Sequence, residues 1–175
     1  MTLVLVVGPS GAGKDTLIAA ASDRLADDHR FVFPRRLVTR EAVAALEDHD
    51  TISWDDFRNG AFALSWEAHG LGYALPLSID DDLEAGRTVV ANVSRRVISL
   101  AAEKYPGTLV ILITADPAVR ARRLAARGRE SDADIAARLA RDVDGIPAGV
   151  RSVTIDNSTS LDKALAAFLA ALNQG

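Results

Sequence analysis

The chain has 175 residues, 49% of them hydrophobic, which is enough for one globular domain with a substantial core. Its net charge of −4 argues against a general nucleic-acid binder, and its lack of cysteine excludes disulfides, thiolate metal sites and cysteine nucleophiles. No apolar run is long enough to cross a bilayer and no signal-peptide pattern is present, so we expect a cytoplasmic protein without a membrane or nucleic-acid partner.

The first predicted elements are a buried strand at residues 3–7 and a helix at residues 16–27, joined by the sequence G-P-S-G-A-G-K-D-T. A strand, a glycine-rich loop and a helix are the context of a phosphate-binding P-loop. Backbone N–H groups of such a loop attract phosphate oxygens, and Lys14 would reach the β- and γ-phosphates. The alternative is a glycine-rich turn that only caps a helix. The residues expected to contact the nucleotide phosphates are Gly8, Ser10, Gly11, Ala12, Gly13, Lys14, Asp15 and Thr16.

Position 15 departs from the usual P-loop pattern, in which a serine or threonine hydroxyl follows the lysine and binds magnesium. Here Asp15 takes that place, and the hydroxyl comes one residue later at Thr16. A carboxylate is a hard oxygen ligand, so Asp15 is the candidate magnesium ligand. The pattern leaves open whether Asp15 or Thr16 binds the metal, or whether Asp15 only caps the helix.

A second strand is predicted at residues 30–34, continued through residues 35–40. Arg36 and Arg40 alternate with Leu37 and Thr39, which puts both arginines on one face of an extended segment. Two guanidinium groups on one face could clamp a phosphate on the acceptor side, and the alternative is a solvated edge strand.

The middle of the chain predicts a helical or irregular segment at 41–49, a helix capped by Ser53, a strand at 62–68 and a turn at 69–73. Tyr73 is either a core tyrosine or a contact to the acceptor. The histidines are expected to have structural roles: His29, His49 and His69.

The second half predicts a helix at 78–86 and a strand at 87–93 that ends in Asn92, which can hydrogen-bond a water or a sugar hydroxyl. Residues 94–96 cap a further helix. Strands at 108–114 and 150–155 alternate with helices that begin at Asp116, at 132 and after Ser160. Arginines over 120–141 are typical of a cationic lid, or alternatively of an exposed basic helix paired with aspartates. The alternation of strands and helices predicts a three-layer α/β fold with a mostly parallel sheet.

Five stretches together resemble the nucleoside monophosphate kinase fold, nearest to guanylate kinases, and more closely the ribose 1,5-bisphosphate phosphokinase family. They are G-P-S-G-A-G-K-D-T-L from Gly8, R-R-L-V-T-R from Arg35, F-A-L-S-W-E-A-H-G-L-G-Y from Phe62, V-V-A-N-V-S-R from Val89 and R-G-R-E-S-D-A-D-I-A-A-R-L-A-R from Arg127.

The resemblance implies one P-loop kinase domain with a core at 1–30, 86–126 and 149–175, an acceptor-binding insertion at 31–85 and a lid at 127–148. It implies ATP and Mg²⁺ as cofactors and ribose 1,5-bisphosphate as the acceptor, which becomes 5-phospho-α-D-ribose 1-diphosphate in phosphonate catabolism. The chain would be a monomer or a homodimer. It departs from the family at 41–44, where relatives commonly carry proline, and at Ala74, where they carry glycine.

The resemblance also implies residue roles. Lys14, Arg127 and Arg138 would be catalytic, while Arg123, Arg127 and Asn157 would contact ATP, with Asn157 near adenine. The acceptor would contact Arg36, Arg40, Tyr73, Asn92, Arg129, Arg138 and Arg141.

Three alternatives remain beside this family. A guanylate kinase would share the fold, but the region 48–53 lacks the aromatic pattern with which guanylate kinases read guanine. A non-catalytic guanylate-kinase-like interaction module would commonly degrade the P-loop, whereas Lys14 and the lid arginines are intact here. A gluconate- or shikimate-type kinase would need a general base for its hydroxyl acceptor, and no convincing histidine or aspartate base is found.

Overall fold

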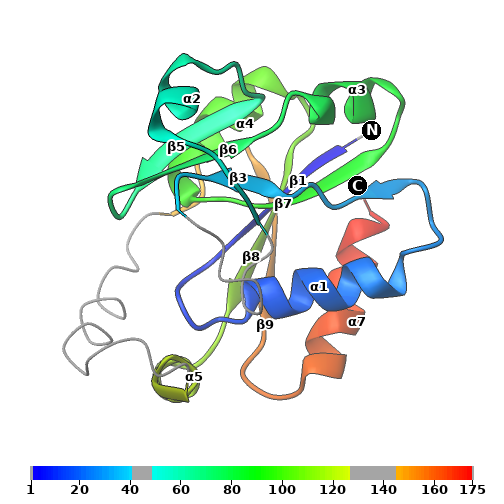
Figure 1. Ribbon diagram of the computed structural model, residues 1–175. Coiled ribbons are helices and arrows are strands. Elements are labelled where there is room, and N and C mark those ends of the chain that lie inside the picture. Colours follow the sequence, from blue (N-terminus) through cyan, green and yellow to red (C-terminus); the bar gives the residue numbers. More distant parts are fainter. Residues whose placement is uncertain (1, 41–48, 127–144, 175) are drawn as a thin grey trace.

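The computed structural model describes residues 2–40, 49–126 and 145–174, which form two sheets and the helices around them (Figure 1). The central sheet has the strand order β2 (Phe31–Val32), β7 (Thr88–Asn92), β1 (Thr2–Val7), β8 (Leu109–Thr114) and β9 (Arg151–Asp156). Every pairing between these strands is parallel. The predicted α/β fold with a mostly parallel sheet is therefore confirmed.

Strand β1 lies in the middle of this sheet and is buried on both faces. Leu3, Leu5 and Val7 join one hydrophobic cluster with α3 (Ser78–Glu84) and α4 (Ile98–Lys104). Val4 and Val6 join a second cluster with α1 (Lys14–Arg24) and α7 (Leu161–Leu172). Because helices cover both faces, the strand has a continuous apolar run instead of an alternating one. The result is the predicted three-layer arrangement.

A smaller sheet lies beside the central one, in the order β4 (His49–Thr51), β3 (Arg36–Val38), β6 (Leu71–Leu75) and β5 (Leu64–Ala68). Helix α2 (Trp54–Asn59) packs against β6, where a Cβ on Gly72 would lie 2.8 Å from the Phe57 ring. Ser53 caps this helix as predicted, since its hydroxyl accepts from the Asp56 N–H at 2.9 Å.

Two sequence-based expectations are wrong here. The predicted continuous strand at 30–40 is divided, because β2 pairs with β7 in the central sheet and β3 pairs with β4 and β6 in the other. Pro34 lies between the two strands and has no N–H for a ladder. The turn predicted at 69–73 is shorter in the structure: it consists of His69 and Gly70, whose φ angles of 55° and 74° are those of a tight hairpin turn. Tyr73 therefore lies in strand β6 and not in the turn.

The remaining elements follow the predicted order. Helix α1 begins at Lys14 and ends at Arg24, earlier at both ends than predicted. The short 3₁₀ helix η1 (Arg95–Val97) leads into α4, α5 (Pro117–Ala126) follows β8, and Ser160 caps α7. The predicted helix at 132–141 lies outside the described residues. Among the helices that the structure describes, none is long and apolar enough to cross a membrane.

Candidate active site

The loop after β1 has the backbone geometry that only glycine tolerates. Gly8, Gly11 and Gly13 have φ angles of 149°, 80° and 90°. A Cβ on Gly8 would lie 2.1 Å from the Ile113 carbonyl oxygen, and one on Gly13 would lie 2.4 Å from the Asn157 amide nitrogen. The glycines therefore let the backbone of the loop lie in close contact with β8 and with Asn157.

Lys14 is the first residue of α1, and its side chain folds back over the loop. Its Nζ donates to the carbonyl oxygens of Gly8 at 2.8 Å and Pro9 at 3.1 Å. The ammonium group therefore lies at the mouth of the curled loop, where a phosphate oxygen could accept a hydrogen bond from it.

Three side chains hold the loop from behind. Arg120 is 5% exposed and its Nε donates to the Ser10 carbonyl at 3.0 Å. Arg123 donates to the carbonyls of Ala12 at 3.3 Å and Asn157 at 2.8 Å. Asn157 is 3% exposed and its Nδ2 donates to the Ala12 carbonyl at 2.8 Å. These contacts fix the backbone of the loop before any ligand arrives.

A second group of polar side chains meets at the start of α1. The parallel pairing of β1 with β7 puts Asn92 opposite Val6, and its Nδ2 donates to Asp15 Oδ1 at 2.5 Å. An Arg36 guanidinium nitrogen lies 3.9 Å from the same carboxylate oxygen. The Asp15 side chain is 65% exposed, so its second oxygen is open to a further partner.

Lys14, Arg36 and Asn92 line an open cavity of about 510 Å³, a volume within the usual range for a small-molecule site. Of the described residues, its lining contains four cationic side chains and no carboxylate. The lining residues come from the P-loop, β3, the β5–β6 hairpin and the segment after β7: Gly8, Pro9, Ser10, Lys14, Arg36, Trp66, Ala68, His69, Tyr73, Asn92, Val93, Ser94, Arg95 and Arg96.

Aromatic rings form one wall of this cavity. Trp66 on β5 and Tyr73 on β6 face each other across the hairpin and stack with centroids 5.6 Å apart and planes 8° apart. The Arg36 guanidinium carbon lies 6.0 Å from the centre of the Tyr73 ring. The stack and the cation limit how these side chains can turn, so the wall is preorganised.

The structure brings several predicted site residues into this cavity, namely Gly8, Ser10, Lys14, Arg36, Tyr73 and Asn92. Arg40 lies beyond the end of β3, which ends at Val38, and is not among the lining residues. Arg123 and Asn157 both donate hydrogen bonds to P-loop carbonyl oxygens, and Arg123 also donates to the Asn157 carbonyl oxygen. Four predicted residues lie outside the described part of the chain: Arg127, Arg129, Arg138 and Arg141.

Sequence reasoning did not assign some lining residues to the site. Trp66 and His69 lie in a stretch that carried the resemblance, but no role was attached to them. Arg95 and Arg96 were predicted only to cap a helix. Their position directly after a buried parallel strand was the available signal, because ligands bind at the carboxyl ends of such strands.

Asp15 is also the described residue best suited to a metal ion. Mg²⁺ is usually held by one or two carboxylates together with substrate phosphates and water. The described residues contain no cluster of three or more metal-ligating side chains, so a fully protein-built site is not found among them. An exposed carboxylate beside Lys14 fits a magnesium ion that arrives with a nucleotide.

Comparison with known proteins gives the family. The chain is 56% identical over 164 residues to ribose 1,5-bisphosphate phosphokinase PhnN from Bradyrhizobium diazoefficiens, which covers 91% of this chain and 82% of the relative. It is 49% identical to the protein of the same name from Brucella melitensis, over 98% of this chain and 91% of the relative. The chain belongs to the ribose 1,5-bisphosphate phosphokinase family. No family model matches it.

Solved structures share the fold of this chain. Guanylate kinase from Anaplasma phagocytophilum matches with a TM-score of 0.70 at 16% identity, over 99% of this chain and 85% of that one. A gluconokinase from Sinorhizobium meliloti matches with a TM-score of 0.56 at 17% identity, over 99% of this chain and 92% of that one. At these identities the likeness concerns the fold alone.

Proposed function

We propose that this protein transfers the γ-phosphoryl group of ATP to the 1-phosphate of ribose 1,5-bisphosphate, giving 5-phospho-α-D-ribose 1-diphosphate and ADP. One observation carries the proposal. The chain is about half identical to named ribose 1,5-bisphosphate phosphokinases, and its P-loop lysine lines a cavity. The described lining of this cavity has four cationic side chains and no carboxylate. Such a lining suits a substrate with two phosphate groups.

The cavity also fits the chemistry of a phosphate acceptor. The second pKa of a phosphate monoester is about 6, so the acceptor is largely a dianion at neutral pH and needs no general base. An acceptor oxygen forms the new bond to the γ-phosphorus while the bond to the bridging oxygen breaks, and ADP leaves with that electron pair. Catalysis then depends on alignment of the two anions and on neutralisation of their charge.

Separate groups of side chains would align ATP and the acceptor. Lys14 and the P-loop N–H groups hold the ATP phosphates, and Lys14 exchanges its carbonyl partners for phosphate oxygens. Arg36 and Tyr73 hold the 1-phosphate of the acceptor, next to the start of α1. Asp15 or Thr16 would hold the Mg²⁺ ion, which would supply positive charge to offset that of the triphosphate.

The other roles expected of this family complete the proposal. Arg127, Arg129, Arg138 and Arg141 supply further cations to the transferred group, and Asn157 lies near adenine. The protein acts in the cytoplasm, in phosphonate catabolism, as a monomer or homodimer.

ADP release from ATP and magnesium, with ribose 1,5-bisphosphate and with GMP in parallel, tests the proposal. Turnover with the sugar bisphosphate alone is the expected result. Lys14→Ala should abolish it, and Lys163→Ala is the matched control, because Lys163 lies on α7 away from the cavity lining. Turnover with GMP and not with the sugar bisphosphate would make the protein a divergent guanylate kinase.

A further inference from the structure

We propose that Arg95 and Arg96 bind the phosphate group of the sugar substrate that does not react, its 5-phosphate. This inference rests on the proposed function, which supplies an acceptor with two phosphate groups. The reacting 1-phosphate must meet the γ-phosphate that Lys14 holds, with Arg36 and Tyr73 as its own partners, so a further cationic site is needed for the other end of the sugar. The cavity lining contains such a site at η1.

The backbone holds both arginines firmly at the cavity. Element η1 follows β7 after a two-residue link, and the Ser94 hydroxyl accepts from the Arg96 N–H at 3.4 Å. The next two residues, Val97 and Ile98, are 2% and 0% exposed and anchor the segment in the core. Because the anchor comes directly after the arginines, their position does not depend on a flexible loop.

The two guanidinium groups differ from the other arginines around the site in their partners. Arg120 and Arg123 are used to hold the P-loop, and Arg36 lies near Asp15. Within the part of the chain that the structure describes, no hydrogen bond or ion pair is found for the guanidinium group of Arg95 or Arg96. Both residues line a cavity whose described lining lacks carboxylates, so an anion can pair with their guanidinium groups without displacing an internal partner.

The arrangement along the chain separates the two phosphate sites. Asn92 contacts Asp15 and thus belongs to the P-loop side of the cavity. Beyond Ser94 the chain packs against strand β5, which carries Trp66 and Ala68 in the lining. Arg95 and Arg96 therefore lie toward the hairpin, and the sugar would span the distance between them and Lys14. A guanidinium group can hold a phosphate through two parallel hydrogen bonds, which favours arginine here.

Kinetics with two acceptors test the proposal. The variants are Arg95→Gln, Arg96→Gln and the double variant, compared with Arg24→Gln, an exposed arginine on α1 outside the lining. The acceptors are ribose 1,5-bisphosphate and ribose 1-phosphate, which lacks the 5-phosphate. In the double variant, kcat/KM for the bisphosphate should fall about 10- to 100-fold, because hydrogen bonds to a charged group are lost. For ribose 1-phosphate, kcat/KM should fall by less than about threefold. Equal losses for both acceptors, or no loss for either, would overturn the proposal.

Binding of ribose 5-phosphate, measured by calorimetry, gives a second readout that needs no turnover. The wild-type protein should bind it, the double variant should bind it at least about tenfold more weakly, and Arg24→Gln should be unchanged. Binding that is absent from the wild type, or unaffected in the double variant, would contradict the site. Arginine-dependent binding without turnover of the bisphosphate would instead support the site and reject the proposed reaction.

Discussion

Replacement of Asn157 by alanine separates two roles for this residue, a brace of the P-loop and a contact to adenine. The Asn157 amide donates to the Ala12 carbonyl at 2.8 Å and is 3% exposed. A buried hydrogen bond that loses its donor costs about 1–3 kcal/mol. Arg123 still donates to the same carbonyl at 3.3 Å, so we expect the lower part of that range, about 1–2 kcal/mol. For a protein of this size the melting temperature should fall by roughly 2–8 °C.

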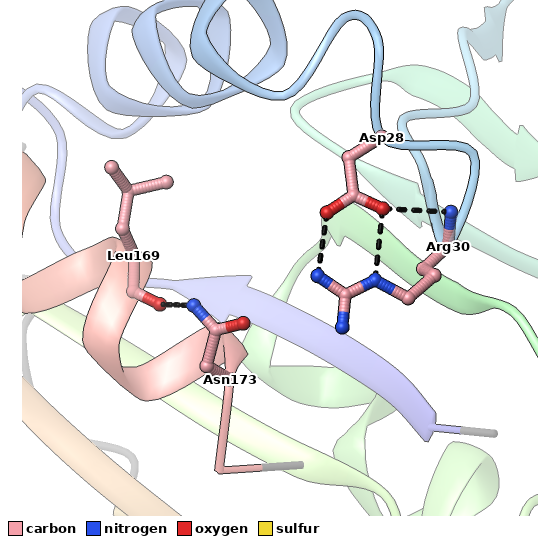
Figure 2. A network of polar contacts seen from close by, with 4 residues as sticks. All are labelled: Asp28, Arg30, Leu169 and Asn173. Carbon is pink, nitrogen blue, oxygen red and sulfur yellow. Dashed lines mark hydrogen bonds and ion pairs between the residues drawn. The ribbon is translucent and has the colours of Figure 1, made fainter.

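The matched control is Asn173→Ala. Asn173 makes the same kind of bond, from its amide to the Leu169 carbonyl at 2.9 Å, but at the exposed end of α7 (Figure 2). An exposed substitution of this kind should change stability by less than about 0.5 kcal/mol. Calorimetric melting of both variants beside the wild type is the assay. A fall for Asn157→Ala no larger than that of the control would refute the bracing role.

Ligand binding by the same variant then tests the adenine contact. A loosened P-loop weakens binding of every phosphate ligand, so ATP and inorganic triphosphate should lose affinity by a similar factor. A lost contact to adenine weakens ATP alone. Comparison of the two dissociation constants therefore decides between the role indicated by the structure and the one implied by the family resemblance.

Three further predictions concern charged side chains. Arg36→Ala should raise the KM of the acceptor at least about tenfold with little change for ATP, and an equal loss for both would contradict its place on the acceptor side. Asp15→Ala should raise the magnesium concentration needed for half-maximal activity, and an unchanged titration would remove its metal role. Arg30 hydrogen-bonds the Asp28 carboxylate and lowers its pKa, so Arg30→Gln should raise that pKa toward 3.8 in an NMR titration (Figure 2). The pair stabilises the fold above pH 3.8, and this stabilisation is lost as the pH falls through the lowered pKa of Asp28. An Asp28 pKa that is unchanged in Arg30→Gln would contradict this prediction.

The P-loop side of the cavity could be predicted because its signals are local in the sequence. The strand, loop and helix of the P-loop are contiguous, and glycine at positions 8, 11 and 13 meets a backbone need that no other residue meets. Helix caps such as Ser53 and Ser160 were predictable for the same reason. The contacts of Arg120 and Arg123 with the P-loop could not be predicted, because an arginine-rich helix has the same sequence pattern whether its arginines contact a ligand or a neighbouring loop.

The side of the cavity that we propose for the acceptor could be predicted only in part, because it is built by contacts between residues far apart in the chain. The division of residues 30–40 between two sheets depends on pairing with β7 and β6, which no local pattern records. Arg36 was found through its spacing, but its neighbour Tyr73 enters the site through the hairpin register opposite Trp66. A one-residue error in such a register would move Tyr73 to the other face of the strand.

The same reasoning explains why Arg95 and Arg96 escaped notice although they follow a buried strand. Their sequence context, a serine before two arginines and an apolar pair, is that of an ordinary helix start. What distinguishes them is spatial: the burial of Val97 and Ile98 fixes them beside β5, and the described residues provide no carboxylate partner. Since the described residues supply no counter-charge for these two cations, an anionic ligand can supply it. Because Lys14 lines the same cavity, an acceptor whose reacting phosphate meets the γ-phosphate held by Lys14 would be able to place its other phosphate at Arg95 and Arg96.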